Sequence, residues 1–177
     1  MLSSKQLSVA PLGIIFLLIS CLSPSAGPDA IAPLASLEQN SFALTFPTIT
    51  DKPVVYLFRP HSMPHLRALI LVDNREIGFT VSNTYLRIEM SPGEHEFVSR
   101  LEYGGNRSKA FQSKPNSEFK FTLQAEAGRI YFIQQSPYPL SWNGRLDLHL
   151  VSEKEGKHEI TRGRYRLLDT QAGQTHD

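Results

Sequence analysis

The residues best suited to metal chemistry lie in the segment "HSMPH", where His61, Met63 and His65 occupy alternate positions. Imidazole and thioether groups are ligands that copper accepts, so these side chains form a candidate copper site. Pro60 and Pro64 mark the same segment as a connection between strands, where histidine and methionine occur without binding anything. Metal binding is therefore an alternative hypothesis, and we expect no metal or other cofactor.

Nucleophilic catalysis is not indicated by any local motif. The sequence contains no Gly-x-Ser-x-Gly segment, and its single cysteine, Cys21, lies at the end of an apolar N-terminal run. Phosphate-binding loops and paired metal-binding carboxylates are absent as well. Serine and histidine residues that are distant in sequence can still assemble in space. We expect no catalytic residues and no enzyme activity, with a hydrolase built from a spatially assembled site as a second alternative.

Two aromatic residues, Tyr138 and Trp142, lie among prolines in the segment "QSPYPLSWNG". Stiff aromatic loops present binding surfaces, so both residues are candidates for ligand or partner binding. Arg59, in another segment, is a third candidate binding residue. The structural alternative is that Trp142 covers an open end of the core. Arg59 has a structural alternative too, which is pairing with an acidic residue such as Asp73 or Glu76.

Two other histidines have simple structural interpretations. His95, in "PGEHEF", lies beside a tight turn, and we expect a hydrogen bond from its ring to the backbone. His149 alternates with Leu148 and Leu150, so it should point to solvent or to a polar groove.

The N-terminal run has the layout of a secretion signal. Lys5 supplies a positive charge, and the residues from Val9 to Ile19 are almost wholly apolar. A membrane-spanning helix needs about 20 apolar residues, so the run is too short for a permanent span.

The segment "LISC", which ends at Cys21, resembles the bacterial lipobox. The resemblance implies that residues 1–20 are removed and that Cys21 becomes the acylated first residue, carrying enough chains for stable anchoring. Cleavage elsewhere is the alternative, although Pro33 disfavours a cut after Ala32. Leu22 follows the cysteine, and by resemblance to enteric bacteria this favours the outer membrane over the inner membrane.

The composition limits the partners and the domain count. The chain has 177 residues and a net charge of +1, so nothing indicates a nucleic-acid partner. We predict an acylated cysteine and a tether rich in Pro, Ser and Ala over residues 21–52, one domain over residues 53–169 and a disordered tail over residues 170–177. Part of the tether, "SFALTFPTI", is apolar enough to dock on the domain.

The domain itself shows the two-residue period of β-strands. In "FKFTLQAE" the apolar residues alternate with polar ones, which predicts a half-buried strand. Apolar runs at 54–58, 68–72 and 129–133 predict central strands covered on both faces. Turn signals separate the runs, at Asp73-Asn74, 91–93, 104–106, 127–128 and Glu155-Gly156. The pattern predicts an all-β fold, a small antiparallel β-sandwich, while "KHEITRGRYRLL" fits either a last strand or a short helix.

Four segments, in order, resemble a known family. "VVYLFRP", "ALILVDNREIG", "NTYLRIEMSPGEHEF" and "AEAGRIYFIQQ" are similar to successive blocks of the bacterial lipoprotein family called domain of unknown function 2846. The resemblance runs from about Val54 to Leu168. It implies a β-sandwich similar to PEGA and transthyretin-like domains, exported and often lipidated, and it implies no activity.

These observations together predict a lipid-anchored protein of the bacterial cell envelope that faces the periplasm. Its folded part is expected to be a non-enzymatic binding or structural module. Its expected partners are the membrane, through the lipid anchor, and another envelope protein; no small-molecule ligand is indicated.

Overall fold

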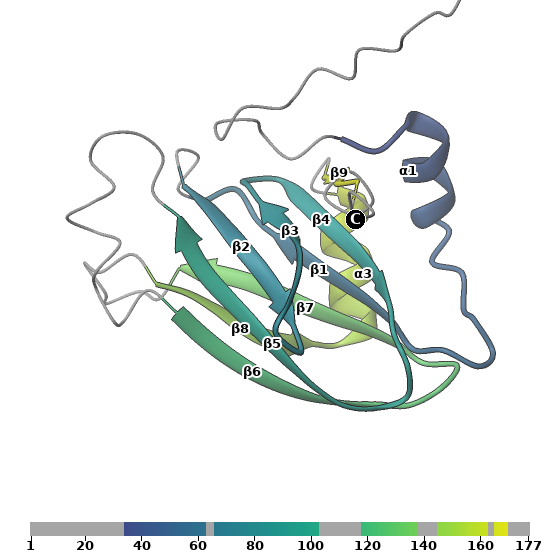
Figure 1. The fold of residues 1–177 in the computed structure, drawn as a ribbon. Coiled ribbons are helices and arrows are strands. Elements are labelled where there is room, and N and C mark those ends of the chain that lie inside the picture. The colour runs from purple at the N-terminus through teal and green to yellow at the C-terminus, as the bar shows by residue number, and fades with distance from the viewer. Residues whose placement is uncertain (1–33, 63–65, 103–117, 138–144, 163–164, 170–177) are drawn as a thin grey trace, which may run out of the picture.

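Two β-sheets packed face to face form the core of the computed structural model, which describes residues 34–62, 66–102, 118–137, 145–162 and 165–169 (Figure 1). One sheet has five strands in the order β8-β7-β1-β4-β9, and the other has four in the order β3-β2-β5-β6. The predicted β-sandwich is thereby confirmed. The strands are β1 (Val54–Arg59), β2 (Arg67–Val72), β3 (Arg75–Thr80), β4 (Thr84–Glu89), β5 (Gly93–Glu102), β6 (Glu118–Ala125), β7 (Ile130–Pro137), β8 (Leu146–Val151) and β9 (Arg166–Leu167).

The four-stranded sheet is antiparallel throughout, as predicted. The five-stranded sheet is mixed, because β1 runs parallel to β7 and β4 runs parallel to β9. A parallel pair needs a long connection between its strands. β1 and β7 meet this requirement, since the whole four-stranded sheet lies between them in sequence.

The predicted turns at Asp73-Asn74 and 127–128 each lie between two consecutive strands, and the turn at 91–93 joins β4 to β5, with Gly93 as the first residue of β5. Asp73 and Asn74 both have positive φ angles, of 51° and 64°. Asp and Asn tolerate that left-handed conformation, and two such residues in a row suit the tight turn of the β2–β3 hairpin. The turn signal at 104–106 lies outside the described residues.

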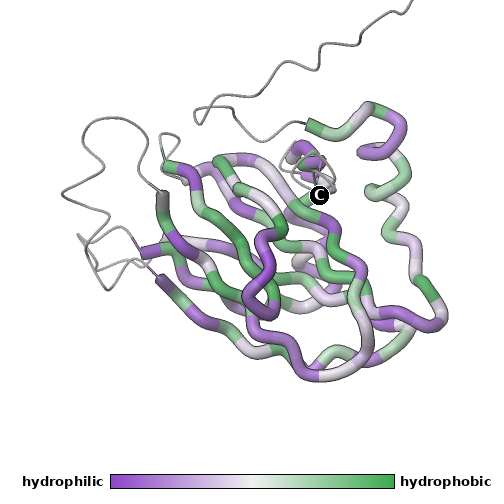
Figure 2. Tube along the Cα trace, in the orientation of Figure 1, coloured by the Kyte–Doolittle hydropathy of each residue, from purple (hydrophilic) through white to green (hydrophobic). Residues whose placement is uncertain are grey.

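The strand β1 lies in the middle of its sheet and has all six residues buried. Val55 and Leu57 point into the space between the two sheets, while Tyr56 and Phe58 point to the opposite face. Figure 2 shows hydrophobic colour running along the central strands. The run of apolar residues without alternation therefore has a direct cause, namely that both faces of β1 are covered.

Two helices cover the outward face of the five-stranded sheet: α1 (Leu37–Ala43) and α3 (Glu153–Arg162). Both contribute to one buried cluster with the outward-facing side chains of the sheet. The buried members of this outer cluster are Ala43, Val54, Tyr56, Phe58, Tyr85, Phe132, Ile160, Tyr165 and Leu167.

The C-terminal segment that fitted either a strand or a helix contains both, with α3 followed by the short strand β9. The predicted turn at Glu155-Gly156 is wrong, because both residues lie inside α3. A Cβ atom added at Gly156 would lie 2.2 Å from an atom of the Phe132 ring. The glycine is therefore required by the close approach of the helix to the sheet and does not mark a chain reversal.

The segment before β1 docks on the sheet from Leu34 onward. Leu34 forms a bridge with Leu168, and Ser36 caps α1 through reciprocal hydrogen bonds with Gln39. The docking of "SFALTFPTI" is confirmed, since Ala43 belongs to the outer cluster and accepts a hydrogen bond from Tyr56. Among the described residues, no helix has both the length and the apolar character to cross a membrane.

Candidate functional site

His61, a ligand in the alternative copper hypothesis, lies just after β1 and is exposed. Its Nδ1 atom lies 3.2 Å from the Asn83 amide nitrogen and 3.3 Å from the Ser82 hydroxyl. Because an amide nitrogen only donates, Nδ1 acts as the acceptor and its lone pair is occupied. Met63 and His65 lie outside the described residues. Within the part that the structure describes, no group of three or more His, Cys, Asp or Glu side chains could hold a metal ion.

The candidate binding residue Arg59 lies in the interior with its side chain fully buried. Its guanidinium donates to the carbonyl oxygens of Leu66 at 2.9 Å, Ser62 at 3.1 Å and Thr80 at 3.3 Å. Burial lowers the pKa of Arg59 to about 10, so the group stays charged at neutral pH. Arg59 thus ties the segment after β1 to the end of β3. The other two candidate binding residues, Tyr138 and Trp142, lie outside the described residues.

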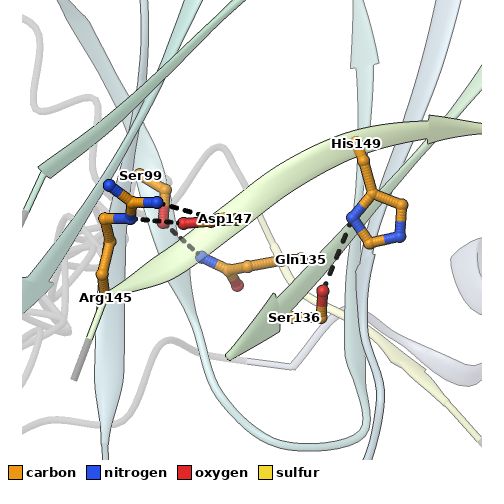
Figure 3. Close-up of polar contacts among 6 residues, drawn as sticks. All are labelled: Ser99, Gln135, Ser136, Arg145, Asp147 and His149. Atoms are coloured by element: carbon orange, nitrogen blue, oxygen red, sulfur yellow. Dashed lines mark hydrogen bonds and ion pairs between the residues drawn. The ribbon is translucent and has the colours of Figure 1, made fainter. Parts of the chain in front are cut away.

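A buried polar row joins the two sheets. Gln135 of β7 accepts a hydrogen bond from Thr80 of β3 at 2.6 Å. It donates one to Ser99 of β5 at 2.7 Å (Figure 3). All three side chains are fully buried. The row satisfies buried polar groups and fixes the register between the sheets, and an enclosed hydroxyl cannot meet a substrate. The sequence analysis missed it, although the polar pair that ends "IYFIQQ" was a signal.

A serine and a histidine also meet on the β7–β8 pair, where Ser136 Oγ is 3.5 Å from His149 Nδ1 (Figure 3). A triad also needs a carboxylate on the histidine. The neighbouring Asp147 instead accepts two hydrogen bonds from Arg145, at 2.6 and 3.1 Å. His149 is exposed, as predicted. These contacts give no support to the hydrolase alternative.

His95 makes two short polar contacts beside the turns that join β2 to β3 and β4 to β5. Its Nδ1 atom lies 2.6 Å from the Asp73 carboxylate, and its Nε2 atom lies 2.7 Å from the Ser91 carbonyl oxygen. A carbonyl only accepts, so Nε2 donates, which confirms the predicted hydrogen bond to the backbone. Asp73 also accepts from the Glu96 amide at 3.0 Å. The β2–β3 turn is thus bound to the turn between β4 and β5.

This contact shifts the pKa values of both side chains. Burial lowers the pKa of His95, but the hydrogen bonds to Asp73 and to the Ser91 carbonyl outweigh it, and the pKa is raised. Burial raises the pKa of Asp73, but the hydrogen bonds from His95 and from the Glu96 amide outweigh it, and the pKa is lowered. The pair is therefore an ion pair over a wide pH range, which stabilises the turns.

A pocket of about 170 Å³ lies where α1 meets the C-terminal strand. Arg87 of β4 forms part of its wall, with Nη1 2.6 Å from the Glu89 carboxylate and its guanidinium 5.9 Å from the Phe42 ring centre. Its Nε atom is buried with no hydrogen-bond partner among the described residues. Because Glu89 already supplies a negative charge, the pocket has little excess charge to attract an anion. Its lining residues are Ala35, Gln39, Phe42, Ala43, Arg87, Leu167, Leu168 and Asp169.

Comparisons with known proteins support the resemblance seen in the sequence. A family model described as protein of unknown function (DUF2846) matches residues 50–139. An uncharacterized protein of Haemophilus influenzae is 25% identical over 153 residues, which cover 85% of this chain and 79% of that protein. No solved structure matches the sequence.

Proposed function

Since this chain belongs to the DUF2846 family of proteins of unknown function, we propose that it is a lipid-anchored protein of the bacterial envelope. Acyl chains on Cys21 hold the molecule at a membrane, and the outer membrane is favoured over the inner membrane. The sandwich faces the periplasm and acts as a non-enzymatic binding or structural module. The uncharacterized relative in Haemophilus influenzae supports the bacterial part of this proposal.

The observation that carries the proposal is the segment "LISC" at the end of the apolar run. Cys21 is the single cysteine of the chain, so it has no intrachain disulfide partner. It stands where a lipoprotein signal is cut, and the apolar run before it is shorter than the about 20 residues that a spanning helix requires.

The docked segment defines how far the domain reaches from this anchor. Twelve residues, 22–33, separate Cys21 from Leu34, which forms a β-bridge with Leu168 just after β9. Fully extended, they span at most about 40 Å, and as a flexible coil about 20 Å on average. The anchor therefore holds the domain close to the membrane surface.

The proposal of a non-enzymatic module rests on what the polar clusters contact. The row through Gln135 is enclosed between the sheets, and Asp147 is bound by Arg145. His95 donates to a carboxylate and to a carbonyl, so neither ring nitrogen is available as a base. Each of these clusters has a structural role that accounts for its contacts.

The anchor is tested by the intact mass of the protein extracted from membranes. We expect a chain that begins at Cys21 and carries the mass of its acyl groups. The Cys21→Ser variant, expressed in the same host, is the matched control and should carry no acyl mass. A wild-type chain that lacks acyl mass and begins at residue 26 or later would overturn the proposal.

A further inference from the structure

Exposed apolar side chains are concentrated at the N-terminal end of the described chain. Four large hydrophobic residues are exposed in the described parts, and three of them fall in the nine residues from 34 to 42. Leu37 is 82% exposed, Phe42 58% and Leu34 39%. The fourth, Leu150, lies on β8, at the opposite edge of the five-stranded sheet from β9. Three exposed apolar side chains, Leu34, Leu37 and Phe42, therefore lie on α1 and just before it, and this set is called the apolar surface below.

The helix α1 leaves two large apolar side chains, Leu37 and Phe42, exposed beside the polar Glu38 and Ser41. It docks through a small residue, Ala43, and through a polar one, Asn40, whose side-chain oxygen accepts hydrogen bonds from Tyr85 and from the Leu167 amide, both at 3.0 Å. An ordinary surface helix buries its large apolar residues against the core. Here Leu37 points away from the domain, so its side chain gains nothing from the fold.

The apolar surface is also the described part of the domain that lies nearest to the anchor along the chain. Only twelve residues separate Leu34 from Cys21. Fully extended, twelve residues span at most about 40 Å, so the bilayer that carries Cys21 is an apolar medium within reach of these side chains. Attachment makes the encounter intramolecular, so a weak intrinsic affinity is sufficient for docking.

We propose that Leu34, Leu37 and Phe42 dock α1 into the lipid surface that carries the acyl chains of Cys21. This inference rests on the proposed anchoring and adds an orientation to it. The five-stranded sheet then has its β9 edge towards the membrane, and the outward face of the four-stranded sheet is left free for a partner. A lipid chain at Cys21 and an apolar helix beside it form the kind of two-part anchor that stable membrane binding uses.

The test uses the acylated protein reconstituted into vesicles of phosphatidylethanolamine and phosphatidylglycerol, with and without brominated acyl chains. Acylation blocks the thiol of Cys21, so an introduced cysteine is the single site for a fluorophore. One probe is placed through Ser41→Cys on the exposed side of α1, and a second through Thr122→Cys on the outward face of the four-stranded sheet.

We expect brominated lipids to lower the emission of the Ser41 probe by roughly half, because interfacial helices bury their apolar face about 5–10 Å into the boundary of headgroups and acyl chains. The Thr122 probe should keep its emission. Adding Leu37→Glu should abolish the quenching at Ser41. The matched change Leu150→Glu, at an exposed leucine far from α1, should leave the quenching intact.

Equal emission from the two probes would overturn the docking, as would quenching that survives Leu37→Glu. A blue shift without bromine quenching would indicate a protein partner or a second copy on α1, and would also overturn it. The intact mass of the same samples separates the two proposals. Acyl mass without quenching rejects the docking and keeps the anchor, whereas absence of acyl mass rejects both.

Discussion

The outward faces of the two sheets differ in what covers them. The outward face of the five-stranded sheet lies under α1 and α3 and contributes to a buried aromatic cluster, in which the Tyr56 and Phe132 rings stack at 5.4 Å. No described element covers the outward face of the four-stranded sheet (Figure 1). On that face Lys120 pairs with Glu96 at 2.9 Å, and the Arg67 guanidinium lies 4.5 Å from the Phe79 ring centre.

This difference explains why β1 of the five-stranded sheet and β6 of the four-stranded sheet have different patterns of apolar residues in the sequence. β6 alternates because one of its faces meets solvent, and β1 does not alternate because it has a core on both sides. β2 is an informative exception. Its outward-facing Leu69 is buried, but no described helix or strand covers this face, so the predicted second cover over the run at 68–72 is not found among the described residues.

The largest expected effect comes from removing an aromatic ring from the covered face. Phe132→Ala should lower the free energy of unfolding by about 3–5 kcal/mol, because the ring is buried between the sheet and α3 and leaves a cavity. Urea-induced unfolding of the purified protein measures the change. Thr122→Ala, on the uncovered face, should change stability by less than about 0.5 kcal/mol. Equal losses for the two variants would contradict the contrast between the faces.

A smaller effect is expected where α3 meets the same ring. Gly156→Ala adds a Cβ atom only 2.2 Å from the Phe132 ring, which should cost about 1–3 kcal/mol through overpacking. Higher helix propensity returns up to about 1 kcal/mol, so a net loss of about 1–2 kcal/mol is expected in urea unfolding. Lys154→Ala, at an exposed position of α3, is the control and should be neutral or slightly stabilising. A Gly156→Ala protein as stable as wild type would show that α3 packs more loosely.

The smallest effect is expected at the turns of the four-stranded sheet, which the His95–Asp73 ion pair connects to the end of β4. Asp73→Asn should cost about 1 kcal/mol at pH 5.5, a value reduced because the Asp73 side chain is nearly half exposed.

The pH dependence of this pair follows from the two pKa directions. The raised pKa of His95 gives stability that is complete below its ordinary value of about 6.5 and is lost as the pH rises through the folded value. The lowered pKa of Asp73 gives stability that is complete above its ordinary value of about 4 and is lost as the pH falls. The difference between wild type and Asp73→Asn should therefore shrink between pH 5.5 and pH 8.5, as read from urea midpoints. Glu94→Gln is the control, and a difference that does not depend on pH would contradict the ion pair.

Local patterns were sufficient to predict several features of the structure. The turn at Asp73-Asn74 follows from two residues that tolerate positive φ, and the exposure of His149 follows from its alternation with leucines. The backbone hydrogen bond of His95 was predictable because Ser91 is only four residues away. The contact of His95 with Asp73 was not, because it spans 22 residues and depends on how β2 pairs with β5.

The amino-acid sequence by itself determined most of the strands, most of the turns and the apolar run that ends at Cys21, because each depends on residues that are neighbours in the chain. Only the tertiary structure decided that Gly156 lies inside a helix that packs against Phe132, that Gln135 joins the two sheets, and that α1 docks through Asn40 and leaves Leu37 exposed. The physical reason is that burial is a property of a packed surface. The pattern of one segment shows which of its side chains share a face, but the elements that arrive from elsewhere in the chain determine whether that face is covered.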